Sequence, residues 1–463
     1  MRVGPLKIRA VTAHTFLPVR ERDRDILRLA VPAFLALVAE PLFLLGDAAV
    51  VGHLGTVPLA GLGLASVVLQ TAVGLCVFLA YATTAAVSRL LGADDLRGAL
   101  AQGIDGLWLA TAVGAVLTVG GVLLADPLVG LFGAGTDVSD AGATYLRIAS
   151  LGVVPLLLVL AATGVLRGLQ DTRTPLVVAV AANALNLGLD VLLVFGAGPV
   201  PGLGIAGSAV ASVIAQALAA LALVAVVVRG ARRHHASLRP DLPGVRASAR
   251  AGAPLLVRTL TLRAALVATA YAVTRGTGGD PASVAAHQLA MTLWGFLAFA
   301  LDAIAIAAQA VVGRALGADD RKETRALTRR MLQWGVWSGV IAGLGLAAVS
   351  PWIGRAFTPD ADVHDLLVPV LLVAALGQPV AGVVFVLDGV LIGAGDGRYL
   401  AWAGAVVLVG YLPLLLAVGL LLSGTAALVG VWAAFAGAFM LGRMVTLVRR
   451  SRGEAWMVTG ARV

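Results

Sequence analysis

Five carboxyl side chains lie inside long apolar stretches of this chain, where an ionisable group is costly and is by default a candidate for function. They are Glu40, Asp47, Asp190, Asp302 and Asp388. Asp47 and Asp190 each come six or seven residues before the predicted outer end of a span, so we expect them at similar depth. Two close carboxylates cannot both stay ionised cheaply, which makes this pair a candidate proton carrier.

Amide side chains accompany the second of these carboxylates. Asn183, Asn186 and Asp190 are spaced by three and four residues, which places all three on one face of a helix. Such a polar stripe cannot face lipid and must face a cavity or another span. The alternative for Asp47 and Asp190 is that hydrogen bonds to neighbours hold them in a purely structural role.

The other three carboxylates have stronger structural explanations. Asp302 has Arg258 and Arg263 in the preceding span as candidate ion-pair partners. Glu40 precedes Pro41, where it could satisfy backbone freed by the proline. Asp388 lies near the inner end of its span, and packing and substrate contact remain equally open for it.

The elements that must position these groups are membrane helices. The chain has 463 residues, of which 59% are hydrophobic and 13% charged, far more apolar than a soluble domain. Its long apolar runs lack a two-residue alternation, which favours helices over a barrel. The fold class is therefore an all-α polytopic membrane protein, with twelve spans near residues 29–52, 59–86, 102–124, 144–165, 175–196, 204–228, 251–273, 285–313, 331–350, 365–391, 400–421 and 426–447.

The chain is duplicated. GVLRGLQDTR at 164–173 recurs as GVLIGAGDGR at 389–398, and SRLLGADD at 88–95 recurs as GRALGADD at 313–320, both at an offset of 225 residues. This predicts two six-helix pseudo-symmetric lobes, an organisation typical of secondary transporters. The repeat conserves the loop motifs but not the membrane carboxylates: Asn186 aligns with Tyr411 and Asp190 with Leu415 at the offset of 225. Asp47 aligns with Thr269 at an offset of 222, which the alignment of Pro32 with Pro254 sets. The loops are therefore predicted to be scaffold, and the carboxylates to be functional.

Positive charge predicts the topology. Of 34 Lys and Arg residues, 29 fall in segments that one orientation assigns to the cytoplasm and two in the opposite loops. Both termini are thus predicted to be cytoplasmic in a multi-pass protein of the inner (plasma) membrane. The predicted domains are a tail over 1–28, a lobe over 29–228, a linker over 229–250, a lobe over 251–447 and a tail over 448–463.

Several function classes are disfavoured. The net charge of +9 is explained by the topology, so no nucleic-acid binding is expected. A single cysteine, and no clustered metal ligands, HExxH or Walker A motif, leave no metal site and no cofactor to expect. GAGD at 393–396 resembles a motif of intramembrane aspartyl proteases, but it lies in a loop.

The order of these motifs resembles a known family. GVLRGLQDTRTP at 164–175, the two LGADD loops, AAHQ at 285–288 and LDGVLIGAGD at 387–396 are similar to the multidrug and toxic compound extrusion (MATE) family, DinF-like branch. The resemblance covers both lobes. It implies a MATE-like fold of twelve transmembrane helices that exports amphipathic, often cationic, compounds in exchange for protons or Na⁺.

The resemblance also implies roles for single residues. Asp47, Asn186 and Asp190 fall on the coupling site of this branch, and Pro32 falls on a proline implicated in helix bending. Tyr145 matches a tyrosine of the fourth span, and Ser208 stands where a threonine is usual. Further candidates for cavity or substrate contact are Asn183, Gln288 and Asp388.

The sequence thus predicts a non-enzymatic multidrug antiporter driven by the proton gradient, acting as a monomer among membrane lipids on small amphipathic or cationic compounds. Three alternatives stay open. The first is Na⁺ coupling in the same fold. The second is a flippase for lipid-linked oligosaccharides, which sparse intramembrane arginine disfavours. The third is an intramembrane hydrolase that uses Asp302 and Asp388.

Overall fold

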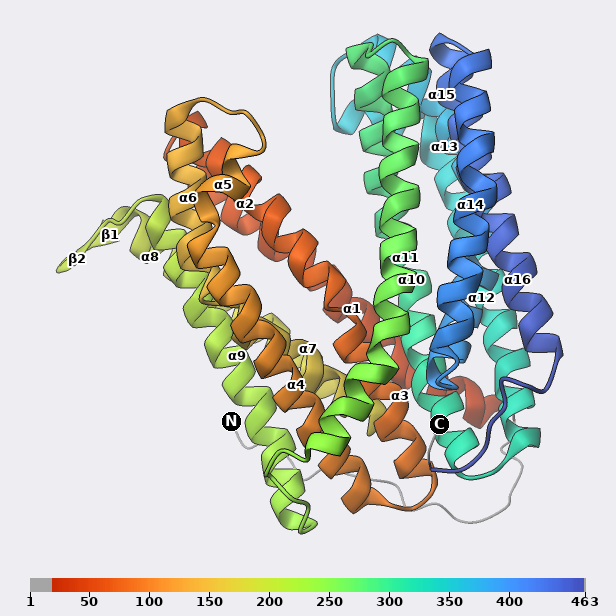
Figure 1. Ribbon diagram of the computed structural model, residues 1–463. Coiled ribbons are helices and arrows are strands. Elements are labelled where there is room, and N and C mark those ends of the chain that lie inside the picture. Colours follow the sequence, from red (N-terminus) through yellow and green to blue (C-terminus); the bar gives the residue numbers. More distant parts are fainter. Residues whose placement is uncertain (1–18, 462–463) are drawn as a thin grey trace. The chain divides into compact units, whose positions relative to one another are not determined.

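The computed structural model describes residues 19–461, which form helices along almost their whole length (Figure 1). The helices of the first half are α1 (Val19–Gly52), α2 (Thr56–Leu75), α3 (Phe78–Gly92), α4 (Leu96–Leu123), α5 (Ala125–Gly130), α6 (Thr136–Ser150), α7 (Val153–Gly168), α8 (Arg173–Phe195) and α9 (Ile205–Arg233). Those of the second half are α10 (Leu242–Gly276), α11 (Pro281–Gly317), α12 (Arg321–Ile353), α13 (Ala361–Gly393), α14 (Gly397–Leu421), α15 (Gly424–Trp432) and α16 (Met440–Arg452). A short hairpin, β1 (Gly196–Ala197) and β2 (Val200–Pro201), joins α8 to α9 (Figure 1).

Among the described residues, eleven helices are long and apolar enough to cross a membrane, and a bent pair raises the number to twelve. The bent pair is α6 and α7, which meet at 50° where the sequence predicts one span over 144–165. The chain turns at Leu151 and Gly152, whose amides bond three residues back rather than four. Pro155 follows in the first turn of α7 and has no amide proton with which to continue the α6 ladder. The predicted count of twelve spans is therefore reached when α6 and α7 are counted together as one broken span.

Contacts divide the chain into two compact units. The first unit comprises Val31–Gly252, and the second comprises Ala253–Ala461 together with the start of α1 up to Ala30. Within the second unit, the start of α1 is tied to α12 by two ion pairs. Arg22 bonds Glu323 at 2.7 Å, and both carboxylate oxygens of Asp23 accept hydrogen bonds from Arg330.

The segment predicted as a linker is shorter than the sequence suggests. Helix α9 ends at Arg233 and α10 begins at Leu242, so the non-helical part is 234–241 rather than 229–250. It packs on α4 of the first unit, where Trp108 Nε1 donates to the carbonyl of Leu238 and Asp105 accepts from the amide of Asp241. Helix α9 ends seven residues before Pro240, and His235 in the turn that follows has a positive φ of 54°.

The repeated loop motifs have repeated backbone structure. Asp94 and Asp319, at equivalent positions of the two LGADD loops, both adopt positive φ (57° and 58°). The next residue in each loop, Asp95 or Asp320, accepts a hydrogen bond from the amide three residues on and caps the following helix. The loop motifs therefore act as scaffold, as their conservation between the halves predicts.

A repeated glycine lets helices approach closely in each unit. A Cβ on Gly164 would lie 2.6 Å from the carbonyl oxygen of Ala80, and one on Gly389 would lie 2.4 Å from that of Ala305. Both pairs are separated by the same 225 residues. The glycine thus fixes the packing of α7 on α3 in the first unit and of α13 on α11 in the second.

Candidate functional site

The predicted polar residues of the first unit meet at one point. The side-chain amide of Asn186 on α8 donates to Oδ1 of Asp47 on α1 at 2.7 Å and to Oδ2 of Asp190 at 2.8 Å. All three side chains are buried, and Asp190 is completely enclosed. One amide group therefore holds two membrane carboxylates side by side, as expected from their spacing and depth.

Local sequence explains this convergence. Asn186 and Asp190 are four residues apart on α8, so they share one helix face. Two neighbours of these residues on α8, Leu185 and Val191, are exposed on the apolar outside of the helix. The apolar flanks place the polar face toward α1 and α9.

Helix α9 contributes a residue that the sequence analysis missed. Ser212 Oγ donates to Oδ2 of Asp47 at 3.3 Å, and the side chain is buried. Ser208, one turn earlier, is fully buried beside the Asp190 carboxyl. The four-residue spacing of two serines in a span was the available indication that α9 presents a polar face to the site.

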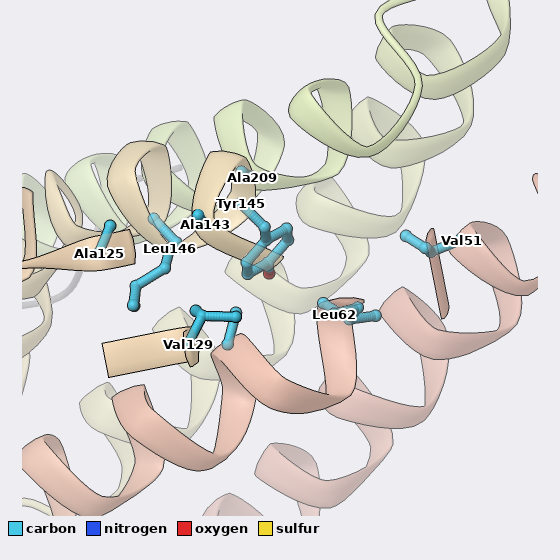
Figure 2. Close-up of a cluster of buried hydrophobic side chains, with 10 residues drawn as sticks. Val51, Leu62, Ala125, Val129, Ala143, Tyr145, Leu146 and Ala209 are labelled. Atoms are coloured by element: carbon cyan, nitrogen blue, oxygen red, sulfur yellow. The ribbon is translucent and has the colours of Figure 1, made fainter. Parts of the chain in front are cut away.

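Tyr145 forms the boundary between the polar site and an apolar core. It is buried on α6 and packs in a hydrophobic cluster with Val51, Leu62 and Leu146 (Figure 2). Its hydroxyl lies close enough to Asp47 to interact with it electrostatically. Tyr145 is thus a wall of the carboxylate site, enclosed by protein.

A cavity of about 260 Å³ opens between α1 and α8 beside the carboxylates. Its polar lining consists of Asp47, Asn183 and Asn186. The remaining lining is apolar and comprises Ala39, Leu42, Phe43, Gly46, Val180, Ala184 and Leu187. Asn183 also crosses to α1 by donating to the carbonyl of Ala39 at 2.8 Å. A largely apolar cavity with a few fixed polar groups suits an amphipathic ligand.

Three oxygen atoms at this site lack hydrogen-bond partners within residues 19–461. They are Asn186 Oδ1, Asp190 Oδ1 and Ser208 Oγ, and all are enclosed. Enclosed polar atoms without partners are unfavourable, so they mark a place where a proton or a cation would be accepted. The arrangement can bind a proton on one carboxyl, and its oxygens are also of the type that ligates Na⁺. The described chain contains no cluster of three His, Cys, Asp or Glu side chains for a transition metal.

The remaining α1 candidates lie away from this hydrogen-bonded centre. Pro32 is buried inside α1, which continues as a helix through it and through Pro41. Glu40 is exposed. Whether Pro32 bends α1 during transport stays a prediction.

The second unit holds a neutral counterpart of the site. Thr269 Oγ1 and the Tyr411 hydroxyl, which align with Asp47 and Asn186 in the repeat, are hydrogen-bonded at 2.8 Å and buried. The duplicated architecture therefore brings the same two positions together in both units, but only the first unit carries carboxylates there.

The structure gives Arg258 a partner that the sequence analysis did not consider. Arg258 binds Asp388 at 2.7 Å, and its predicted pairing with Asp302 stays a prediction. Arg443, on α16, also binds the Asp388 carboxylate. Sequence reasoning placed Arg443 at the cytoplasmic end of the last span and so missed this contact.

The candidates at the start of the eighth predicted span lie on α11. Gln288 is exposed there, next to the buried His287. The His287 Nδ1 atom faces Trp432 Nε1 at 3.2 Å. Gln288 thus stays a candidate for substrate contact, while His287 is held by a neighbouring ring.

The comparisons with known proteins identify the family. The MatE family model matches residues 32–192 and 260–415, which include Asp47, Asn186 and Asp190. The chain belongs to the MatE family. Members of this family are multidrug transporters, and the chain is accordingly a multi-pass membrane transporter.

Relatives of this MatE chain come from plants and bacteria. It is 32% identical to Protein DETOXIFICATION 44, chloroplastic, of Arabidopsis thaliana, over 88% of this chain and 78% of the relative. It is 28% identical to DNA damage-inducible protein F of Escherichia coli, over 80% of this chain and 81% of the relative. This second match agrees with the DinF-like resemblance of the motifs.

The fold also agrees with solved structures. A crystal structure of a MATE protein in the bent conformation matches with a TM-score of 0.85 at 20% identity, covering 94% of this chain and 96% of the solved chain. This likeness supports the twelve-helix, two-lobed fold of the family.

Proposed function

We propose that this MatE protein exports amphipathic, often cationic, compounds across the plasma membrane by exchange for protons at Asp47, Asn186 and Asp190. The observation that carries the proposal is the single Asn186 amide that bridges both carboxylates beside an apolar cavity. A cationic substrate and a proton would compete for the same negative charge. No bound cofactor is needed, because the gradient supplies the energy.

The energetics allow this exchange. One proton that moves inward gains roughly 2.3 kcal/mol per 100 mV of membrane potential. A tenfold gradient of exported substrate costs about 1.4 kcal/mol. One proton per cycle therefore suffices for an uncharged substrate, whereas a monovalent cation that leaves the cell costs the same roughly 2.3 kcal/mol per 100 mV and needs a second proton or a pH gradient.

Two neutral variants test the site. Asp47→Asn and Asp190→Asn keep the shape of each side chain but remove its ability to carry a proton or to hold a cation. We expect each to abolish energised ethidium efflux while the protein still reaches the membrane. Asp137→Asn, an exposed position at the start of α6, is the matched control and should transport normally. Full efflux by either site variant would assign that carboxylate a structural role.

Na⁺ coupling is the second candidate, and a specific observation favours it. The unpartnered oxygens Asn186 Oδ1, Asp190 Oδ1 and Ser208 Oγ, together with Asp47, supply the oxygen ligands that a hard cation needs. Against it, serine replaces the usual threonine, and no Gly/Pro pair next to Asp190 unwinds α8 to expose carbonyls.

Proteoliposomes separate the two ions. With an imposed pH gradient in Na⁺-free buffer, we expect substrate efflux that collapses when the pH gradient is dissipated. Efflux that requires an opposing Na⁺ gradient and ignores pH would reject the proton and assign the oxygen cluster to Na⁺.

A further inference from the structure

The second unit carries a basic and aromatic surface where α14 begins and α16 ends. The two helices run side by side in opposite directions (Figure 1), and the Tyr399 hydroxyl of α14 donates to the Thr446 carbonyl of α16 at 2.7 Å. Further into the spans, a Cβ on Gly442 would lie 3.4 Å from the Val407 side chain. The charge bias of the chain predicts that this end of the helix pair is cytoplasmic. The surface is therefore expected at the level of the inner lipid head groups.

One arginine at this end is already neutralised by a carboxylate. Arg450 donates to both oxygens of Asp396, at 2.6 and 3.2 Å. Its guanidinium also lies 4.9 Å from the centre of the Tyr399 ring. This ion pair therefore fixes the ring between the two helices, and it occupies the carboxylate that the other arginines nearby could otherwise use.

Three further arginines at this end are exposed. Arg398 lies in the first turn of α14, and Arg449 and Arg452 lie in the last turn of α16. Arg449 is close enough to Tyr399 to act on its hydroxyl electrostatically. The next acidic side chain along the chain, Glu454, is bound by arginines of α12. The three exposed positive charges therefore face outward, where an anion from outside the protein can reach them.

An exposed tryptophan lies one helical turn from these charges. Trp402 is 56% exposed, comes four residues after Arg398 on the same face of α14, and has its ring 5.7 Å from that of Tyr399. Further into the spans the exposed side chains are apolar, with Val409 on α14 at 69% and Val445 on α16 at 61%. The surface thus changes from apolar to aromatic to basic toward the helix ends. A phospholipid has the same order, from acyl chain through the interface to the phosphate.

We propose that the exposed arginines of α14 and α16, together with Trp402, bind the head group of an anionic phospholipid in the cytoplasmic leaflet. Guanidinium groups bind phosphate oxygens through paired, charge-assisted hydrogen bonds. The acyl chains lie along the exposed valines, with Trp402 at the level of the glycerol. Basic clusters at the cytoplasmic face of a membrane prefer anionic to zwitterionic lipids. This lipid site goes beyond the proposed exchange and does not depend on it.

Brominated lipids test the site, because a brominated acyl chain quenches the fluorescence of a tryptophan that it touches. The full chain is reconstituted in phosphatidylcholine vesicles with a varied fraction of dibrominated phosphatidylglycerol or, in the matched arm, of dibrominated phosphatidylcholine. The difference between the natural chain and Trp402→Phe isolates the signal of Trp402 from that of the other tryptophans. Since each arginine near the membrane surface contributes about fivefold, we expect phosphatidylglycerol to associate with Trp402 at least about tenfold more strongly than phosphatidylcholine.

A triple variant assigns the preference to the arginines. It combines Arg398→Gln, Arg449→Gln and Arg452→Gln. All three positions are exposed, so the variant should fold, and it should lose the preference for phosphatidylglycerol at Trp402.

A second triple variant is the matched control. It removes three exposed arginines at the end of α9, in the first unit, by Arg229→Gln, Arg232→Gln and Arg233→Gln. It loses the same total charge from helix ends that are also predicted to be cytoplasmic. It should keep the preference, because the arginines beside Trp402 remain.

Three results would overturn the proposal. The first is equal quenching of Trp402 by the two brominated lipids. The second is a preference that survives in the variant of α14 and α16. The third is an equal loss in both triple variants, which would mean that total charge and not this surface attracts the lipid. The measurement needs no transported substrate, so its outcome is independent of whether the chain exports ethidium.

Discussion

At the residue scale, the site depends on how one amide divides its two hydrogens. Asn186 gives one to Asp47 and one to Asp190, so its removal would leave two enclosed carboxylates without a common donor. The sequence predicted this meeting, because helical spacing and depth are local properties. It did not predict Ser212 or Arg443, since their partners come from other helices and only packing brings them together.

Replacing Asn186 by alanine should therefore reduce energised ethidium efflux by at least about tenfold, because hydrogen bonds to charged groups contribute about 1.5–3 kcal/mol each. Asp137→Asn, the exposed position at the start of α6 that serves as control above, should export at the natural rate. Initial efflux rates, normalised to the amount of protein in the membrane, make the comparison. Equal losses in the two variants would show that the bridge has no special role.

At the element scale, the fold is held by helices that approach at repeated glycines. The repeat was visible in the sequence because both glycines lie in motifs that recur after 225 residues. The break between α6 and α7 was not predicted, since hydropathy averages over the two helices and a single glycine with a nearby proline leaves that average apolar. Hydropathy thus finds spans but does not find bends within them.

Gly389→Ala should lower thermal stability, because the new methyl group would lie 2.4 Å from the Ala305 carbonyl and push α13 from α11. Overpacking of this kind typically costs about 1–3 kcal/mol, which corresponds to a few degrees in melting temperature. Gly410→Ala in α14 meets no atom within 4 Å and should change the melting temperature little. Melting of the purified proteins in one detergent gives the result. A Gly389 variant as stable as the Gly410 variant would mean that α13 can move without cost.

At the scale of the whole molecule, duplication explains both the symmetry of the scaffold and the asymmetry of the chemistry. In each unit, one hydrogen bond joins the equivalent helices. It runs from Asn186 to Asp47 at 2.7 Å in the first unit and between Thr269 and Tyr411 at 2.8 Å in the second. The first pair carries a carboxylate and the second is Thr269 with Tyr411. The two units thus share the arrangement of these helices but differ in charge at the paired positions. This asymmetry could be predicted from the aligned repeat, whereas the Arg258–Asp388–Arg443 cluster could not, because both arginines lie outside the quoted motifs and only packing brings them to Asp388.

Orientation in the membrane is also a property of the whole chain. The segments assigned to the cytoplasm hold 29 of its 34 Lys and Arg residues, and the opposite loops hold only Arg275 and Arg355. A bias of this size fixes which loops stay inside during insertion. We therefore expect both termini and the linker near residues 234–241 to be cytoplasmic.

A reporter that is active only in the cytoplasm, fused after Val463, should be active. The same reporter inserted at Gly278, in the loop between α10 and α11, should be silent and provides the control. If the first fusion is silent and the second active, the orientation is reversed. The cavity beside Asp47 would then lie in the half of the membrane nearer the cytoplasm, and a proton entering there from outside could not displace a substrate outward by the proposed exchange.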